Sequence, residues 1–310
     1  MKLLALVFLL FYFSSPTLTE VVKSFEQSCP QFFIPNPDKP SDIIIPTVFP
    51  GWQYKKICQR WQGKFRFATV YDTVRRIPVY SAYTFSQEGE TRRTKTWKIE
   101  PQLDDTKGSR EMIDSPREAG SIYNQAVNSD YTGTGFTRGH VFPRMFAADQ
   151  DQANSTFTLT NVAPQTPDSN QKWAEKVETL ILKEINQTCE LDPYQVYIVT
   201  GVVPGKDWIS IRRDGREYPE GINIPSHFWS AYCCRNKKNP GKFITGAYIT
   251  KQESFNLRRP NIHHLNIELT KLYNEKIPFN VFPGLHCVWY RSLRFQDPGT
   301  PKFGIYSPIN

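Results

Sequence analysis

The chain of 310 residues carries 38 Lys and Arg against 30 Asp and Glu, so its formal net charge is +8. A basic excess of this size favours anionic partners such as nucleic acid, heparan-like glycans or acidic lipid, and it also keeps a protein soluble. The sequence has no low-complexity block and no internal repeat, which excludes a repeat protein, and beyond residue 13 no segment is apolar enough to cross a membrane.

The first segment is typical of a secretory leader. After a single basic residue, an unbroken apolar run extends from Leu3 to Phe13, and small polar residues follow it. The run is too short to span a bilayer. Thr17 and Thr19 form a small-x-small cleavage site, so we predict a signal peptide over 1–19 and a secreted, extracellular protein, with an uncleaved membrane anchor as the alternative.

The rest of the chain reads as one domain. It has no Gly/Ser tract that would mark a linker, and the 24 prolines of the sequence are scattered. We therefore expect a single domain over 20–292 and a short irregular tail over 293–310, with no membrane span in the mature chain. Sequons at Asn154 and Asn186 fit a secreted glycoprotein.

Two β-branched and aromatic runs, 65–71 and 77–85, flank a short turn and predict a β-hairpin. Three more strands, each bounded by Pro, Gly or Asn, are predicted over 194–203, 224–234 and 242–250. We expect all of these strands to lie in one sheet.

Two helices are predicted. The first opens at Ser169 and runs to about Asn186, with apolar residues at helical spacing and with Asp168 or Ser169 available as its cap. The second covers 261–276. Because strands and helices do not alternate regularly, the pattern indicates an α+β fold rather than a doubly wound one.

Six cysteines follow the leader, an even number that predicts disulfides in an oxidising compartment: Cys29, Cys58, Cys189, Cys233, Cys234 and Cys287. A bridge between Cys29 and Cys58 would tie down an N-terminal segment with few core formers. The other four would supply two more bridges, because the adjacent pair bonds to itself only with severe strain. A zinc site on the adjacent pair and a histidine is the alternative, which the lack of a C-x-x-C spacing disfavours.

The stretch 134–146, TGFTRGHVFPRMF, and the helix after it hold the residues that suit chemistry. His140, with an unperturbed pKa of about 6.5, would be mostly neutral at extracellular pH and able to take a proton from water, with activity falling below roughly pH 6. Arg138 offers a fork for phosphate, and the amide oxygen of Asn170 suits a hard cation such as Mg²⁺. Singly, each residue has an ordinary structural role, but a base, a hard metal and a phosphate clamp together indicate a phosphodiester hydrolase.

Glu178 follows Asn170 by eight residues. An α-helix turns through about 800° over that distance, which leaves the two side chains about 80° apart around the axis and roughly 12 Å apart along it. They cannot easily share one metal ion. Because helical side chains lean toward the N-terminus, we expect Glu178 to point toward the site as a carboxylate that orders water.

The order of these motifs resembles that of a known family. R-G-H at 138–140, N-x-x-P-Q at 161–165 and an Asn with Glu eight positions later look like the DNA/RNA non-specific endonucleases of the ββα-metal (His-Me finger) type. The segments SAYTF and TKTWKIEP upstream, and YIVTGVVPG and IPSHFWSAYC downstream, are similar to further motifs of that family, so the likeness covers roughly 67–248. It implies an antiparallel central sheet flanked by helices, with an embedded ββα-metal motif.

The resemblance implies a role for each candidate residue. In the catalytic group, His140 would act as the general base and Asn161 as a supporting residue. Arg138 and Glu178 would be partners of the site and of the phosphate. Asn170 would be the direct protein ligand of the metal, with Mg²⁺ as the expected ion and Mn²⁺ able to replace it.

The sequence departs from the family pattern at three positions. Lys95, a predicted substrate contact together with Arg138, stands where the family tends to have a phosphate-contacting arginine, and this exchanges a bidentate clamp for a point charge. Thr137 stands where the pattern has Asp, and so lacks a carboxylate that would strengthen metal binding. Trp173 comes one residue early after Asn170, which predicts a slightly rearranged start of the helix.

Three functions fit these observations, and we favour the first. It is a secreted, metal-dependent endonuclease that hydrolyses phosphodiester bonds of DNA and/or RNA without sequence preference and holds its substrate through the phosphate backbone. The second is a catalytically weakened or inactive pseudonuclease that binds nucleic acid or other polyanions. The third is a glycan-binding or structural extracellular protein that uses the basic clusters at 75–76, 92–95 and 235–238.

Overall fold

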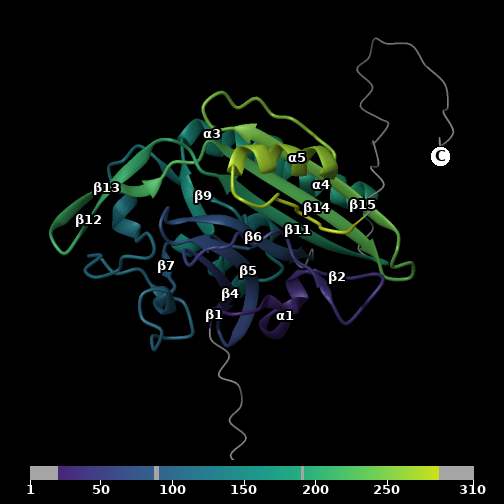
Figure 1. The fold of residues 1–310 in the computed structure, drawn as a ribbon, viewed down its shortest axis with the longest axis horizontal. Helices are drawn as coiled ribbons and strands as arrows, with labels where there is room; N and C mark the ends of the chain where they lie inside the picture. Colours follow the sequence, from purple (N-terminus) through teal and green to yellow (C-terminus); the bar gives the residue numbers. More distant parts are fainter. Residues whose placement is uncertain (1–19, 87–90, 190–191, 286–310) are drawn as a thin grey trace, which may run out of the picture.

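A seven-stranded antiparallel sheet forms the centre of the molecule (Figure 1). The computed structural model describes residues 20–86, 91–189 and 192–285. In their order across the sheet, the strands are β1 (Val21–Val22), β4 (Tyr54–Trp61), β5 (Lys64–Asp72), β6 (Ile77–Phe85), β11 (Tyr194–Val203), β14 (His227–Asn236) and β15 (Phe243–Lys251). The predicted hairpin and the three later strands all lie in this sheet, which confirms that expectation.

Short strand pairs and helices surround the sheet and complete an α+β fold, as predicted. The pairs are β2 (Ile34–Pro35) with β3 (Ile43–Ile44), β7 (Lys98–Ile99) with β8 (Ile113–Asp114), β9 (Thr137–His140) with β10 (Val162–Gln165), and β12 (Trp208–Arg213) with β13 (Arg216–Asn223). The α-helices are α1 (Phe25–Ser28), α2 (Gln150–Ser155), α3 (Pro167–Trp173), α4 (Thr179–Thr188) and α5 (Ile262–Tyr273).

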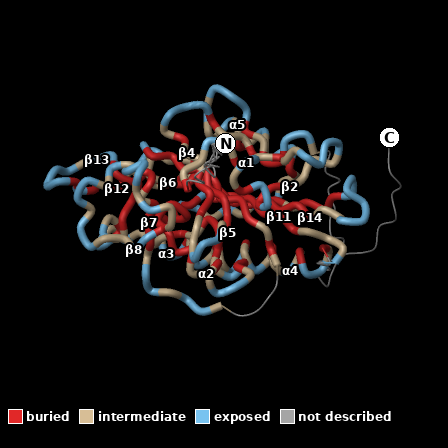
Figure 2. The backbone as a smooth tube through the Cα atoms, turned by 90° about the horizontal axis from the view of Figure 1, so that it is seen from below, coloured by how far each residue is buried: buried red, intermediate tan, exposed pale blue. Residues whose placement is uncertain are grey.

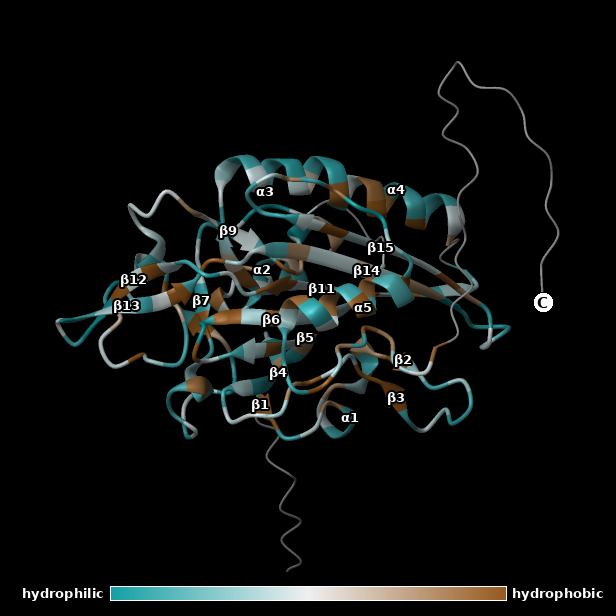
Figure 3. Cartoon of the chain, turned by 45° about the horizontal axis from the view of Figure 1, so that its top comes forward, coloured by the Kyte–Doolittle hydropathy of each residue, from teal (hydrophilic) through white to brown (hydrophobic). Residues whose placement is uncertain are grey.

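The sheet separates two hydrophobic cores. Along β11, Val196 and Ile198 point into one core, whereas Tyr197 and Val199 point into the other, because successive strand residues face opposite sides. Figure 2 shows the buried sheet between two layers, with α2, α3 and α4 on one side and α1 and α5 on the other. In Figure 3, α4 and α5 carry both hydrophilic and hydrophobic residues, as helices with one buried side do.

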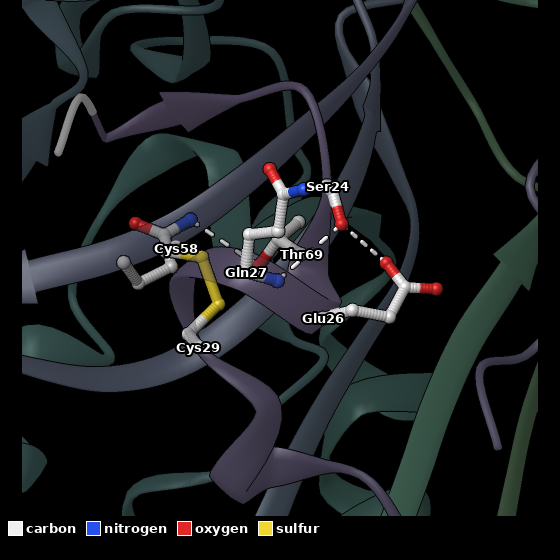
Figure 4. Close-up of a disulfide and its surroundings, with 7 residues drawn as sticks. Ser24, Glu26, Gln27, Cys29, Cys58 and Thr69 are labelled. Atoms are coloured by element: carbon white, nitrogen blue, oxygen red, sulfur yellow. Dashed lines mark hydrogen bonds between the residues drawn. A yellow bond between two sulfur atoms is a disulfide. The ribbon is translucent and has the colours of Figure 1, made fainter. Parts of the chain in front are cut away.

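A disulfide fastens the N-terminal segment to the sheet. Cys29, directly after α1, is bonded to Cys58 in β4, as predicted (Figure 4). The start of α1 is capped by Ser24, whose Oγ accepts a hydrogen bond from the backbone N–H of Gln27. This short helix and its disulfide therefore cover the edge strands from the side of α5.

The adjacent cysteines of β14 serve different cores. Cys234 faces the core of α4 and is bonded to Cys189, just beyond the end of that helix, whereas Cys233 faces the opposite core. Successive residues of a strand face opposite sides of the sheet, which explains why only Cys234 of this pair faces Cys189. The zinc alternative is wrong, because the sulfur of Cys234 is used in the disulfide. Cys287 lies outside the described residues, so its pairing stays a prediction.

The predicted leader, 1–19, and the predicted tail, 293–310, also lie outside the described residues. Within the described ranges, no helix is long and apolar enough to cross a membrane. The proposed domain boundaries therefore remain expectations at both ends.

A ββα unit carries the R-G-H motif. β9 pairs antiparallel with β10, so that His140 lies opposite Val162 and Thr137 opposite Gln165. The glycine of the motif allows a close approach of the two strands, because a Cβ on Gly139 would lie 2.8 Å from the Cβ of Gln165. Helix α3 begins almost at once after β10, which places its first turn beside β9 (Figure 1).

The long helix differs from the prediction at its start. It begins at Pro167 rather than Ser169, and its cap is Thr166, whose side chain accepts a hydrogen bond from the backbone N–H of Ser169. Pro167 is well suited to the first helical position, because it lacks an N–H that would otherwise be unpaired. The expected capping by Asp168 or Ser169 is therefore wrong.

The helix also changes its winding in the middle. After α3, residues Ala174–Glu178 form a π-helical turn in which the amide of Thr179 donates to the carbonyl of Ala174, five residues back, and α4 continues to Thr188. A π turn takes about one residue more than an α turn. The side chains of Asn170 and Glu178 are therefore separated by roughly 100° less rotation around the helix axis than in an ideal α-helix. The expected angle of about 80° between them becomes about 20° in the opposite direction.

Candidate active site

The Thr137 hydroxyl joins the hairpin to the helix at the centre of the candidate site. Thr137 Oγ1 donates its one hydrogen to the backbone carbonyl of Gln165, 2.8 Å away. It must therefore accept from the side chain of Asn170, so the atom of Asn170 that faces it, at 3.0 Å, is the amide nitrogen Nδ2. This fixes the orientation of the amide and turns Oδ1 of Asn170 away from the hairpin.

Two aromatic rings enclose the His140 ring. Its centroid lies 4.8 Å from that of Phe157, edge to face, and 5.5 Å from that of Trp97. The Nε2 atom of His140 is buried and has no hydrogen-bond partner among the described residues. A ring held by packing with an unpaired nitrogen is suited to accept a proton from a water molecule or a substrate group.

Burial and two arginines keep the His140 ring neutral. Burial lowers its pKa to about 3, and the positive charges of Arg93 and Arg144 act in the same direction, while the backbone carbonyl of Arg138 opposes the shift. Protonation of the ring therefore requires far more acid than an ordinary imidazole does. The acid limit near pH 6 that the sequence suggests moves accordingly to lower pH.

Arg138 is held rigidly beside this ring. Its guanidinium lies over the ring of Trp97, 5.3 Å from the centroid, and over that of Tyr131, at 4.9 Å. Its Nη2 donates to the backbone carbonyl of Asn128 at 2.6 Å, whereas its Nε is buried without a partner among the described residues. The guanidinium is thus preorganised, with donor capacity left for an anion.

Asn161 is placed to support the hairpin rather than to touch a substrate. Its side chain is fully buried, and its Oδ1 accepts from the backbone N–H of Phe142 and from the hydroxyl of Ser81. Its Nδ2 donates to the backbone carbonyls of Phe142 and Thr156. These bonds fix the chain two residues after His140.

Glu178 lies on the same helix as Asn170, and the π turn places the two side chains on nearly the same side of the helix. Burial raises the pKa of Glu178 to about 8, and the charge of Arg144 partly opposes this shift. Arg144 therefore acts electrostatically on both His140 and Glu178.

Two arginines at this site were not singled out from the sequence. Arg144 begins the 3-10 turn Arg144–Phe146 after β9, and its Nη1 donates to the backbone carbonyl and the hydroxyl of Thr91. Arg93 belongs to the basic cluster 92–95 and lies over the ring of Phe157, 6.0 Å from its centroid. The signal that could have found Arg144 is its position four residues after His140, within the same motif stretch.

Lys95 is exposed on the segment between Thr91 and Trp97. That segment contributes Arg93 and Trp97 to the surroundings of His140, so the predicted substrate contact lies on a piece of chain that borders the site. One of the three clusters considered for glycan binding is therefore part of the candidate active site.

The residues present suit a lightly ligated hard cation. In the described parts of the chain, no group of three or more His, Cys, Asp or Glu side chains could hold a metal ion. Asn170 Oδ1 is a neutral oxygen that receives no hydrogen bond from the described residues. Mg²⁺ accepts such a ligand because it usually keeps several of its waters, whereas zinc sites use three or four protein ligands drawn from Cys, His, Asp and Glu.

Comparison with known proteins indicates the same family that the sequence motifs resemble. A family model described as DNA/RNA non-specific endonuclease matches residues 54–278. The endonuclease domain-containing 1 protein of Homo sapiens is 34% identical over 184 residues, which cover 58% of this chain and 34% of that protein. Its Mus musculus counterpart is 32% identical over the same shares of both chains. The match thus spans about a third of the length of these curated relatives.

Two more distant likenesses differ in how much of the chain they cover. Mitochondrial endonuclease G of Homo sapiens is 31% identical over 124 residues, 36% of this chain and 39% of that protein. A solved chain in the crystal structure of the EndoG/EndoGI complex covers 71% of this chain and 85% of its own length, with a TM-score of 0.44 and 16% identity.

The lowered pKa of His140 predicts an unusual titration. In the unfolded chain a histidine takes up its proton near pH 6.5, whereas the folded site takes it up only near pH 3. The neutral ring therefore contributes stability that is fully present above about pH 6.5 and is lost as the pH falls from there. NMR of ¹³C-labelled histidine, with the His140→Asn variant as the assignment control, should show no His140 inflection between about pH 5 and 8. An inflection near the ordinary value would contradict the burial and the arginine contacts described above.

Proposed function

Because the chain belongs to the family of DNA/RNA non-specific endonucleases, we propose that it is a secreted, metal-dependent enzyme that hydrolyses phosphodiester bonds of nucleic acids without sequence preference. The observation that carries the proposal is the hydrogen-bonded chain from Gln165 through Thr137 to Asn170, which starts on the strand that ends with the neutral His140. The leader 1–19, the domain 20–292 and the tail 293–310 belong to the same proposal. The two disulfides support an oxidising compartment, as a secreted protein would meet.

In this proposal, His140 is the general base. Its pKa is low enough to keep the ring neutral at physiological pH, and its unpaired Nε2 would accept the proton of the attacking water. Trp97 and Phe157 would hold the ring in place and exclude bulk water from one side. Asn161 would act through the backbone of Phe142 to fix the hairpin.

The arginines would bind the scissile phosphate. Arg93 and Arg144 approach His140 from two different segments, and Arg138 is locked nearby with unused donors. Three guanidinium groups in the surroundings of the base suit the spread charge of a phosphodiester in its transition state. Lys95 would add a point charge at the edge of the site.

Asn170 Oδ1 would hold Mg²⁺, with Mn²⁺ able to replace it. When bound, such an ion supplies positive charge that stabilises the departing oxygen and the charge on phosphorus. The role of Thr137 is to keep Oδ1 of Asn170 turned toward the ion. Glu178, brought round by the π turn, would order the ion's waters and the Arg144 side chain.

Loss of the base should abolish cleavage without abolishing binding. We expect His140→Ala to lower the rate of Mg²⁺-dependent plasmid nicking by about 10²- to 10⁴-fold, the usual contribution of a general base. Affinity for labelled DNA, measured by fluorescence anisotropy in EDTA, should stay nearly unchanged, because binding rests on the basic surface. Wild-type protein that is inert with Mg²⁺ and Mn²⁺, and stays inert as Thr137→Asp, would support the pseudonuclease instead.

Substitutions of Thr137 test whether its hydroxyl orients Asn170 as the metal ligand. Thr137→Val keeps the shape of the side chain but can neither donate to Gln165 nor accept from Asn170, so the amide loses its orientation. We expect a loss of about 10- to 100-fold in Mg²⁺ affinity or activity, as for other residues that orient a ligand. Thr137→Ser, which keeps the hydroxyl, is the matched control and should retain most of the activity. Equal activity in both variants would show that the hydroxyl does not orient Asn170.

A further inference from the structure

A groove of about 600 Å³ lies apart from His140, where the turn between β5 and β6 meets β13. Three aromatic side chains line it: Trp52, Tyr123 and Tyr218. Trp52 is 72% exposed, the largest exposed fraction among the large hydrophobic residues of the described chain. An exposed tryptophan of this kind, next to further exposed aromatic surface, is unusual for a side chain that is normally well buried, and it marks a binding surface.

The groove is preformed. Arg76, on the turn between β5 and β6, donates through Nε to the carbonyl of Tyr123 and through Nη1 to the carbonyl of Gly221, at 2.8 Å each. The rings of Tyr123 and Tyr218 pack edge to face with centroids 6.2 Å apart. Walls from three separate parts of the chain are thus tied together before any ligand is present, which lowers the cost of binding one.

A rigid segment connects the groove to the active site. Arg213 is fully buried and donates to the carbonyls of Ile122 and Gln125 and, in a two-point ion pair, to Asp130. The same segment then reaches the active site, where Tyr131 contacts the Arg138 guanidinium. The groove residue Tyr123 lies eight positions before Tyr131, so the Cα atoms of these two residues are at most about 28 Å apart.

This separation suits one continuous strand of nucleic acid. At about 3.4 Å per nucleotide, a stacked strand covers 28 Å in roughly eight nucleotides, and an extended strand in fewer. A strand whose phosphate lies at His140 can therefore place a nearby base in the groove.

The lining of the groove fits the face and the edge of a base. Aromatic rings stack on any nucleobase, which agrees with binding that does not depend on sequence. At the rim, the carboxylate of Glu220 can accept from an exocyclic amine, and Arg76 supplies positive charge. A paired base in a duplex hides both its faces, so only an unpaired base can enter.

Resting on the proposed nuclease function, we propose that this groove stacks an unpaired base of the substrate strand within about eight nucleotides of the scissile phosphate. The groove then makes long single strands better substrates than short ones. It acts on substrate binding and contributes nothing to the chemical step itself.

The test compares Trp52→Ala with Trp52→Phe, which keeps an aromatic ring, and with Ile267→Ala, which removes an exposed hydrophobic side chain from α5 on another face. The substrates are a single-stranded oligodeoxycytidylate of about 20 nucleotides and a dinucleotide. We expect Trp52→Ala to lower kcat/KM on the long strand by roughly 5- to 100-fold, the effect of losing one stacked base, and to leave the dinucleotide unaffected. Trp52→Phe and Ile267→Ala should stay close to wild type.

Affinity for the labelled long strand, measured by anisotropy in EDTA, separates this proposal from the nuclease function. A fall in affinity for Trp52→Ala alone supports the groove even if no variant cleaves. Equal affinity in wild type and Trp52→Ala overturns it. The proposal is also overturned if Trp52→Ala loses affinity for heparin but keeps its affinity for the oligonucleotide, because the groove would then bind a glycan.

Discussion

The single hydrogen of the Thr137 hydroxyl determines how the proposed metal ligand is presented. It goes to the carbonyl of Gln165, which lies opposite Thr137 in the β9–β10 register, and the hydroxyl oxygen is then left to accept from Asn170. The register between two strands of four residues each thus fixes the orientation of an amide on the following helix. An ionised Asp at this position would also accept from Asn170 but could not donate to the carbonyl. Compared with Asp, Thr137 therefore lacks a negative charge but still holds Oδ1 of Asn170 in the same direction.

The electrostatics of His140 link the base to its substrate. Burial is the main cause of the low pKa of the ring, and the charges of Arg93 and Arg144 lower it further. A bound phosphodiester would offset the charge of these arginines and so raise the pKa of His140 in part, while the effect of burial would remain.

Much of the fold could be read from the sequence because strand and helix periods are strong signals. The hairpin, the later strands and α5 were predicted close to their observed positions, since each has regular spacing and clear boundaries. The start of α3 differs from the prediction because Thr166 caps the helix and Pro167 suits its first position.

The site was less predictable, because side-chain contacts depend on packing. The positions of His140, Arg138 and Asn170 around one hairpin and helix followed from the order of the motifs. The π turn did not, although it directly follows Trp173, the residue that departs from the family spacing. The effect of Arg144 on both His140 and Glu178 depends on the tertiary structure, because Glu178 lies on a helix far along the chain.

The location of a bound metal ion tests most directly whether Asn170 is the metal ligand. Crystals of the protein soaked with Mn²⁺, and examined by anomalous diffraction, should show one ion beside Oδ1 of Asn170, with waters completing its coordination and His140 nearby. The same peak should be absent or weak in Thr137→Val, where the amide is no longer oriented. An ion bound elsewhere, or a peak equally strong without the hydroxyl, would contradict the claim that Thr137 presents Asn170 to the metal.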